Sequence, residues 1–248
     1  MSRVGRNRLL SFVRAALLPA LAAIPLAAAG APEPEAFPVV LGSFSTTLAG
    51  SVPARTDNVR RAAQALDGAV LEPGEVLSFN RQVGPRTLER GYQPAPVILR
   101  ETRQTQLGGG ICQVASTLFD AALIAGLTPV ERWRHSTPVD YISLGQDATI
   151  SWGVKDLKLR NDLEQRVRVR TVLLGTTLTF RIEGESETAD LYELETVVGE
   201  TDQNIGAAGG REVELYRTRR RDGETVAREL VHRDVYPPSQ PIDPGSGR

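Results

Sequence analysis

A glycine-rich turn that leads into an apolar helix, with a cysteine at the junction, constrains this chain more than any other feature. It spans residues 108–127 and reads GGGICQVASTLFDAALIAGL. Its apolar residues recur at helical spacing, at Ile111, Ala115, Leu118, Ala122 and Ala125. Gly126 and Pro129 then predict where the helix ends. We therefore predict a central helix that begins near Cys112.

Cys112 is the only cysteine in the chain. At the start of a helix, the free amide N–H groups and the positive end of the helix dipole favour the thiolate over the thiol. An anionic sulfur beside backbone donors suits acyl-transfer chemistry. The alternative is structural, because a free cysteine is often a small buried residue, here next to a tight turn. A lone cysteine forms no internal disulfide, so pairing between molecules is a further alternative.

The N-terminal residues 1–30 resemble a secretory signal peptide. Four arginines precede an apolar run at residues 15–29, which ends in small residues. The run contains two prolines and is short for a membrane span, so we expect cleavage and no permanent span afterwards. Removing it takes away four arginines and no acid, which changes the formal charge from −1 to −5. We therefore expect an exported protein of the periplasm or the extracellular cell envelope.

Composition disfavours several kinds of partner and cofactor. An acidic exported chain with 5% aromatic residues is a poor candidate for binding nucleic acid. One cysteine and two histidines, without a histidine pair at helical spacing, do not provide the usual zinc ligands. The sequence contains no phosphate-binding loop and no dinucleotide-binding glycine pattern. We expect neither a metal nor a cofactor.

The patterns predict an α+β fold, with the central helix packed on a mostly antiparallel sheet and a small C-terminal β extension. We expect a helix at residues 58–66, capped by Thr56 or Asp57, and a short strand pair within 70–84. Further strands are predicted at residues 39–47, 130–135, 148–152, 166–173, 177–182, 211–217 and 225–233. The expected organisation is a signal peptide at 1–30, a flexible leader at 31–38, the main domain at 39–185, the β extension at 186–241 and a disordered tail at 242–248.

His135 and Asp147 are the expected catalytic partners of Cys112. His135 ends the strand predicted after the central helix, and an antiparallel strand can return its end to the start of that helix. The imidazole would take the thiol proton, while Asp147, or Asp140 as second choice, would fix the ring tautomer. The alternative for His135 is a turn residue bonded to backbone. His232 is expected on a solvated strand face.

Four residues are candidates for binding the substrate. Gly109 and Gly110 bring backbone close to the thiol, and the side-chain amide of Gln113 is placed to face an oxyanion. Ser136 follows the candidate base directly. Gln113 has the alternative of an ordinary surface residue.

Ten short motifs together resemble the VanW-like family. They are residues 79–80, 84, 90–92, 109–118, 125–127, 130–136, 138–139, 145–149, 156–157 and 160–161. The similarity covers about residues 39–185, and residues 209–241 resemble the β tail often found after such domains. Ala115 departs from the serine or threonine common at its position. The resemblance implies a cell-envelope setting, with peptidoglycan as the expected partner, and implies no particular reaction.

Two functional hypotheses follow. The first is an exported enzyme of amide chemistry, a hydrolase or acyl transferase that acts on peptidoglycan or another envelope polymer through Cys112, His135 and Asp147. The second is a non-catalytic envelope-binding module, in which Cys112 and its glycines serve packing and residues 145–149 shape a groove. Substitution of Cys112 separates the two.

Overall fold

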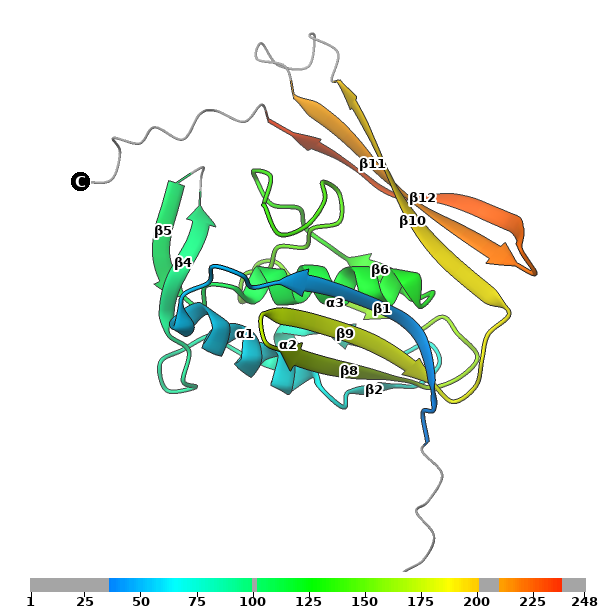
Figure 1. The fold of residues 1–248 in the computed structure, drawn as a ribbon, viewed down its shortest axis with the longest axis horizontal. Helices are drawn as coiled ribbons and strands as arrows, with labels where there is room; N and C mark the ends of the chain where they lie inside the picture. The colour runs from blue at the N-terminus through cyan, green and yellow to red at the C-terminus, as the bar shows by residue number, and fades with distance from the viewer. Residues whose placement is uncertain (1–35, 100–101, 201–209, 238–248) are drawn as a thin grey trace, which may run out of the picture. The chain divides into compact units, whose positions relative to one another are not determined.

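A helix packed on a four-stranded antiparallel sheet forms the centre of the chain. The computed structural model describes residues 36–99, 102–200 and 210–237. Helix α3 (Ile111–Ile124) packs against β1 (Val39–Thr47) and β9 (Thr177–Gly184). The sheet continues through β8 (Val167–Leu174) to β2 (Val70–Leu71), in the order β1-β9-β8-β2. Figure 1 shows these strands side by side along α3. The predicted α+β class is confirmed.

Small residues allow α3 to lie close to this sheet. Ala115, Ala121 and Ala122 are fully buried along the helix. On the facing strand, a Cβ atom added to Gly42 would lie 2.5 Å from the Ala125 nitrogen, which is too close for any side chain. The glycine in β1 therefore fixes how closely strand and helix approach.

Helix α1 (Pro53–Leu66) begins five residues earlier than predicted. Neither Thr56 nor Asp57 caps it. Val52 occupies the cap position, and Pro53 opens the helix, where its fixed φ angle fits and its missing N–H costs nothing. This early start brings Arg55 into the first turn of α1.

Residues 70–84 contain a short helix as well as the two predicted strands, but these strands lie in different sheets and do not form the predicted pair. Strand β3 (Val76–Ser78) leads directly into α2 (Phe79–Val83), whose first turn is capped by the Ser78 hydroxyl accepting a bond from the Arg81 N–H. Strand β3 pairs with β7 (Lys158–Arg160), and β7 pairs with β6 (Thr128–Glu131). Strands β4 (Pro94–Leu99) and β5 (Thr102–Leu107) form a separate antiparallel pair.

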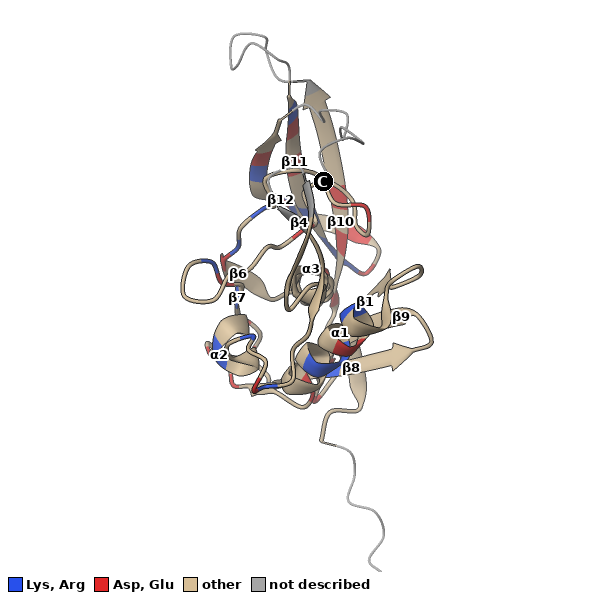
Figure 2. Cartoon of the chain, turned by 90° about the vertical axis from the view of Figure 1, so that its left-hand side faces the viewer, with Lys and Arg blue, Asp and Glu red and all other residues tan. Residues whose placement is uncertain are grey.

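The C-terminal β extension is a three-stranded antiparallel sheet, β10-β11-β12. The predicted hairpin corresponds to β11 (Arg211–Arg221) and β12 (Glu224–Tyr236). Strand β10 (Asp190–Glu200) was not predicted, because its acidic sequence lacks a regular apolar pattern. Its acids instead pair with arginines of the other two strands, as in Asp190 with Arg221 of β11 and Glu195 with Arg228 of β12. Figure 2 shows both signs of charge along these strands.

Of two strands predicted near the candidate site, the one at 130–135 is formed only in part and the one at 148–152 is not formed. Strand β6 ends at Glu131, and residues 132–135 form an irregular segment instead of its continuation. Residues 148–152 form no strand and contribute only an isolated bridge between Ser151 and Lys155. In this segment Thr149 faces the site, while Ala148 and Ile150 pack into the hydrophobic core, so the alternating pattern reflects burial without sheet pairing.

The predicted signal peptide, most of the leader and the predicted tail lie outside the described residues. Among the helices of the described part, none has the length and apolar character needed to cross a bilayer.

Candidate active site

Cys112 is the second residue of α3, directly after the turn that starts the helix. The preceding cap residue, Gly110, has φ 103°, a left-handed conformation that favours glycine. A Cβ on Gly110 would also lie 2.8 Å from the Val59 side chain. The Cys112 sulfur is half-buried, 3.4 Å from the Thr149 hydroxyl and 3.8 Å from the Ile150 carbonyl oxygen. The thiol is therefore held in place and not merely packed in hydrocarbon.

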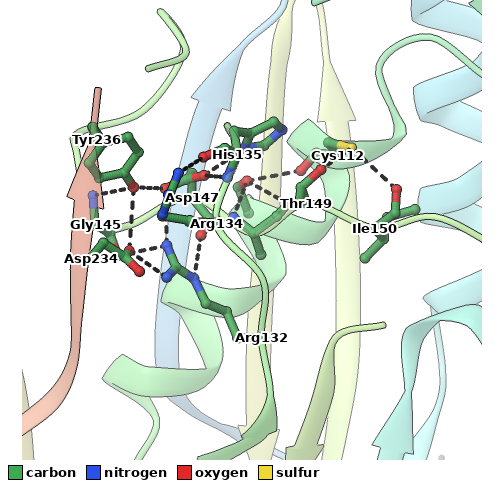
Figure 3. Close-up of polar contacts among 12 residues, drawn as sticks. Cys112, Arg132, Arg134, His135, Gly145, Asp147, Thr149, Ile150, Asp234 and Tyr236 are labelled. Carbon is green, nitrogen blue, oxygen red and sulfur yellow. Dashed lines mark hydrogen bonds and ion pairs between the residues drawn. The ribbon is translucent and has the colours of Figure 1, made fainter. Parts of the chain in front are cut away.

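His135 and Asp147 lie beside this thiol. The ring nitrogen Nδ1 of His135 is 2.6 Å from Asp147 Oδ2, and the His135 backbone N–H donates to the same oxygen at 2.6 Å. Because Asp147 occupies Nδ1, the other ring nitrogen is the one left for the Cys112 thiol, which raises the pKa of the imidazole. Figure 3 shows the ring between the carboxylate and the sulfur. The three residues thus form a Cys-His-Asp array.

The array favours a thiolate beside an imidazolium. Burial alone would raise the pKa of the Cys112 thiol, but His135 and then Thr149 hydrogen-bond to the sulfur and lower it to about 7. Burial likewise disfavours charge on His135, but its bonds to Asp147 and Cys112 raise the pKa of the imidazole to about 9. Between these two values the proton resides on the ring. The pair titrates as a unit, so each value belongs to the coupled system.

Asp147 is held by the C-terminal strand as well as by its neighbours. Its side chain is only 3% exposed. Oδ1 accepts a 3.0 Å bond from Arg132 and a short bond from the Tyr236 hydroxyl of β12. Arg132 also pairs with Asp234 of β12. Burial would raise the pKa of Asp147, but the bond to His135 and the charge of Arg132 lower it to about 2. The carboxylate therefore stays ionised and fixes the ring.

Cys112 and His135 open onto a cavity of about 430 Å³. Its walls come from the end of β1, the first turn of α1, strand β4, the turn before α3 and the loop at residues 139–141. Gly110 and Gln113 line it, and so do Arg55 and Tyr141. A small acyl compound entering this cavity reaches the sulfur and the imidazole together.

The other expected binding residues occupy different environments. Gly109 is buried, and a Cβ there would lie 2.6 Å from the Ala95 carbonyl oxygen, so its role in the fold is close packing against β4. Gln113 is 1% exposed, and its amide is fully used: Oε1 accepts from Arg55, and Nε2 donates to Thr46 and Thr47. Ser136 is not among the cavity-lining residues of the described chain.

His232 does not lie on a solvated strand face, contrary to the prediction. Its side chain is 17% exposed, packs near the Phe119 ring and bonds the Gly145 carbonyl oxygen at 2.8 Å. Burial and the charge of Arg132 lower its pKa to about 4. The strand alternation of β12 gave no sign that this face docks on the core.

Sequence reasoning missed three contributors to the site. Thr149 lies within one of the motifs that carry the family resemblance, but no role was assigned to it. Arg55 precedes the helix start that was predicted from the capping residues. Tyr236 lies on the β extension, 89 residues beyond Asp147, and no local pattern connects the two. Only the first of these had a signal in the sequence.

Comparisons with known proteins give a consistent result. The sequence model of the family described as VanW like protein matches residues 54–183. An uncharacterized Bacillus subtilis protein, YoaR, is 41% identical over 138 residues, which cover 56% of this chain and 46% of that protein. The vancomycin B-type resistance protein VanW of Enterococcus faecalis is 30% identical over 142 residues, covering 55% and 52% respectively. The chain thus spans about half the length of each of these relatives. No solved structure matches it significantly.

Proposed function

The chain belongs to the VanW-like protein family, and from this premise we propose that it is an exported cell-envelope enzyme with Cys112 as nucleophile. Its reaction is amide hydrolysis or acyl transfer on peptidoglycan. The observation that carries this proposal is the Cys112-His135-Asp147 array, which opens onto a cavity. A half-buried thiolate, a base in contact with it and a buried carboxylate that orients the base are the parts required for covalent acyl chemistry.

The first step forms a thioester. The Cys112 thiolate attacks the substrate carbonyl carbon, and the carbonyl electron pair moves to oxygen. When the tetrahedral intermediate collapses, the C–N bond breaks and the imidazolium of His135 gives its proton to the leaving amine. Water or an acceptor amine, deprotonated by His135, then attacks the thioester. The acyl group leaves as an acid or a new amide, and the thiolate with its imidazolium partner is restored.

Backbone donors at the start of α3 support the oxyanion. The Ile111 and Gln113 N–H groups bond the carbonyl oxygens of Gly108 and Gly110. The Cys112 N–H belongs to the same first turn, where amides have no partner within the helix. We assign it as an oxyanion donor, since an N–H on the nucleophile itself lies close to the carbonyl under attack. The Gln113 side chain, being fully bonded, supports the turn.

The envelope setting rests on two supports. The N-terminal residues carry a basic start, an apolar run and small residues, which is the composition of an export signal. One relative is named a vancomycin B-type resistance protein. An exported cysteine enzyme would meet peptidoglycan stem peptides as abundant amides in that compartment.

The test is a search for covalent turnover. The purified protein is incubated with peptidoglycan fragments that carry stem peptides, and intact-mass spectrometry follows Cys112 adducts and released products. We expect an acyl adduct and new products with the wild type, no products with Cys112→Ser, and reduced formation of the adduct with His135→Gln. Equal product formation by wild type and Cys112→Ser would refute a nucleophilic role.

A non-catalytic binding module is the second candidate. The observation in its favour is that Gly109 and Gly110 are each required by close packing, so the glycine-rich turn is explained without chemistry. In that case Cys112→Ala retains peptidoglycan binding in a pull-down assay, and neither adducts nor products form with the wild type.

A further inference from the structure

Arg55 presents a positive charge to the cavity beside the thiol. It lies in the first turn of α1 and lines the same cavity as Cys112. Its stem crosses Gly110, since a Cβ on that glycine would lie 3.0 Å from Arg55 Cγ. The glycine therefore opens the space through which the guanidinium reaches the start of α3.

The bonds of this guanidinium are to neutral oxygens. Nη1 donates to the Ser51 hydroxyl at 2.9 Å, and Nη2 donates to Gln113 Oε1 at 2.7 Å. Across the described residues, Arg55 forms no ion pair within salt-bridge distance. Tyr141, Asp140 and Cys112 act on it from longer range, and Asp140, an exposed residue on the same cavity wall, is the carboxylate among them. A guanidinium has five N–H donors, so a planar anion can still bind it.

The position of the charge relative to the sulfur is fixed. Gln113 follows Cys112 in α3, and its amide is bonded to Arg55 on one side and to Thr46 and Thr47 of β1 on the other. This chain of bonds ties helix α1, the start of α3 and the end of β1 together. An anion bound at Arg55 is therefore held at a defined offset from the reacting carbon.

We propose that Arg55 binds a carboxylate of the acyl donor, so that the substrate is a peptide with a free carboxylate close to the amide that is attacked. This assignment of substrate class rests on the proposed function of the same site. A planar guanidinium matches the two oxygens of a carboxylate, and pairing it in a half-buried site offsets the cost of an uncompensated charge. The negative charge of Asp140 repels a bound carboxylate and lowers its affinity for Arg55.

Two small alkylating agents of nearly equal size test the proposal, because one carries the carboxylate and the other does not. Iodoacetate and iodoacetamide both react by thiolate displacement of iodide at Cys112. The measured quantity is the ratio of their second-order rate constants, iodoacetate over iodoacetamide. We expect Arg55→Gln to lower this ratio about 10-fold. Asp140→Asn raises it.

The matched control is Arg60→Gln on the exposed side of the same helix, where the arginine pairs with Asp57. It leaves the ratio unchanged, since Arg60 does not line the cavity. Arg55→Lys retains the charge without the planar fork and gives an intermediate ratio. An unchanged ratio in Arg55→Gln overturns the proposal.

A second measurement uses the wild type alone and does not depend on the folding of any variant. N-acetylalanine and its uncharged amide, N-acetylalaninamide, compete with iodoacetamide for the cavity. We expect the carboxylate compound to slow alkylation at lower concentration than the amide, and equal protection overturns the proposal. The results distinguish failure of the two proposals. If the Cys112 pKa is ordinary but the ratio of rate constants depends on Arg55, then Cys112 is not an activated nucleophile. If the Cys112 pKa is lowered but the ratio does not depend on Arg55, then Arg55 does not bind the carboxylate.

Discussion

Removal of the imidazole from the array should change the reactivity of Cys112 in opposite directions at low and high pH. In the wild type, His135 and Thr149 lower the pKa of the thiol to about 7 against the opposing effect of burial. In His135→Gln only burial and weaker hydrogen bonds act, so the pKa returns to about 8.5 or higher. The substitution retains a polar side chain of similar size next to Asp147.

The magnitude follows from these two values. At pH 6 the thiolate fraction falls from about 9% to about 0.3%, a loss of about 30-fold. The thiolate that remains is about 5-fold more nucleophilic, because intrinsic reactivity rises with pKa. Alkylation at pH 6 therefore slows about 6-fold, whereas above pH 10 the variant reacts about 5-fold faster than the wild type. The wild type and the variant should react at equal rates at about pH 8.

The assay is the second-order rate of iodoacetamide labelling from pH 5 to pH 11, followed by intact mass. The chain has one cysteine, so each adduct reports on Cys112. Cys112→Ser supplies the blank, and circular dichroism at each pH confirms that the variant is folded. Wild-type and His135→Gln profiles that coincide would show that the imidazole does not act on the sulfur, and His135 could then not be the catalytic base.

Three further substitutions test the supporting structure. Tyr236→Phe removes a bond to the Asp147 carboxylate and should lower the free energy of unfolding at pH 7 by about 1.5–3 kcal/mol. The deficit should shrink as pH falls toward 2, where the carboxyl protonates, and urea titrations at both pH values measure it. Gly42→Ala meets the α3 backbone and should cost about 1–3 kcal/mol or prevent folding, whereas Gly199→Ala, with open space around it, should cost almost nothing in the same thermal melts. Burial raises the pKa of Asp120, whose oxygens have no hydrogen-bond partner within the described residues. Asp120→Asn should therefore stabilise the protein increasingly as pH rises above 3.8, as urea titrations across this range would measure. A stability difference that is constant from pH 4 to pH 8 would contradict this account of Asp120.

The sequence predicted the elements whose patterns are local. Helix α3 was recognised from its apolar spacing and its flanking glycines, and β1 and the β8–β9 hairpin from runs of β-branched residues between turns. In residues 130–135 the strand ends at Glu131, and in 148–152 Ala148 and Ile150 are buried in the core without strand pairing, so alternation alone did not predict a sheet there. The start of α1 was misplaced because a proline at the first position outweighs capping residues three and four positions later.

For the site, the sequence indicated which residues could carry the chemistry but not which residues surround and position them. Cys112, His135 and Asp147 were selected for their chemistry and order along the chain, and the structure brings the three together. The placement of His135 and Asp147 on irregular segments, the contribution of Thr149 and the contact of β12 with Asp147 depend on long-range packing, which residue spacing does not encode. Gln113 illustrates the difference, since an amide next to a nucleophile looks available until its three partners are known.

The contact between β12 and Asp147 has a consequence for how this chain folds. The hydroxyl that reaches the carboxylate comes from a residue 89 positions downstream, so the sulfur is synthesised long before the strand that completes its surroundings. Until β12 docks, Asp147 lacks its bond from Tyr236 and Arg132 lacks its pair with Asp234. We therefore expect the charged form of the Cys112-His135-Asp147 array to be less stable in a partly folded chain than in the folded protein.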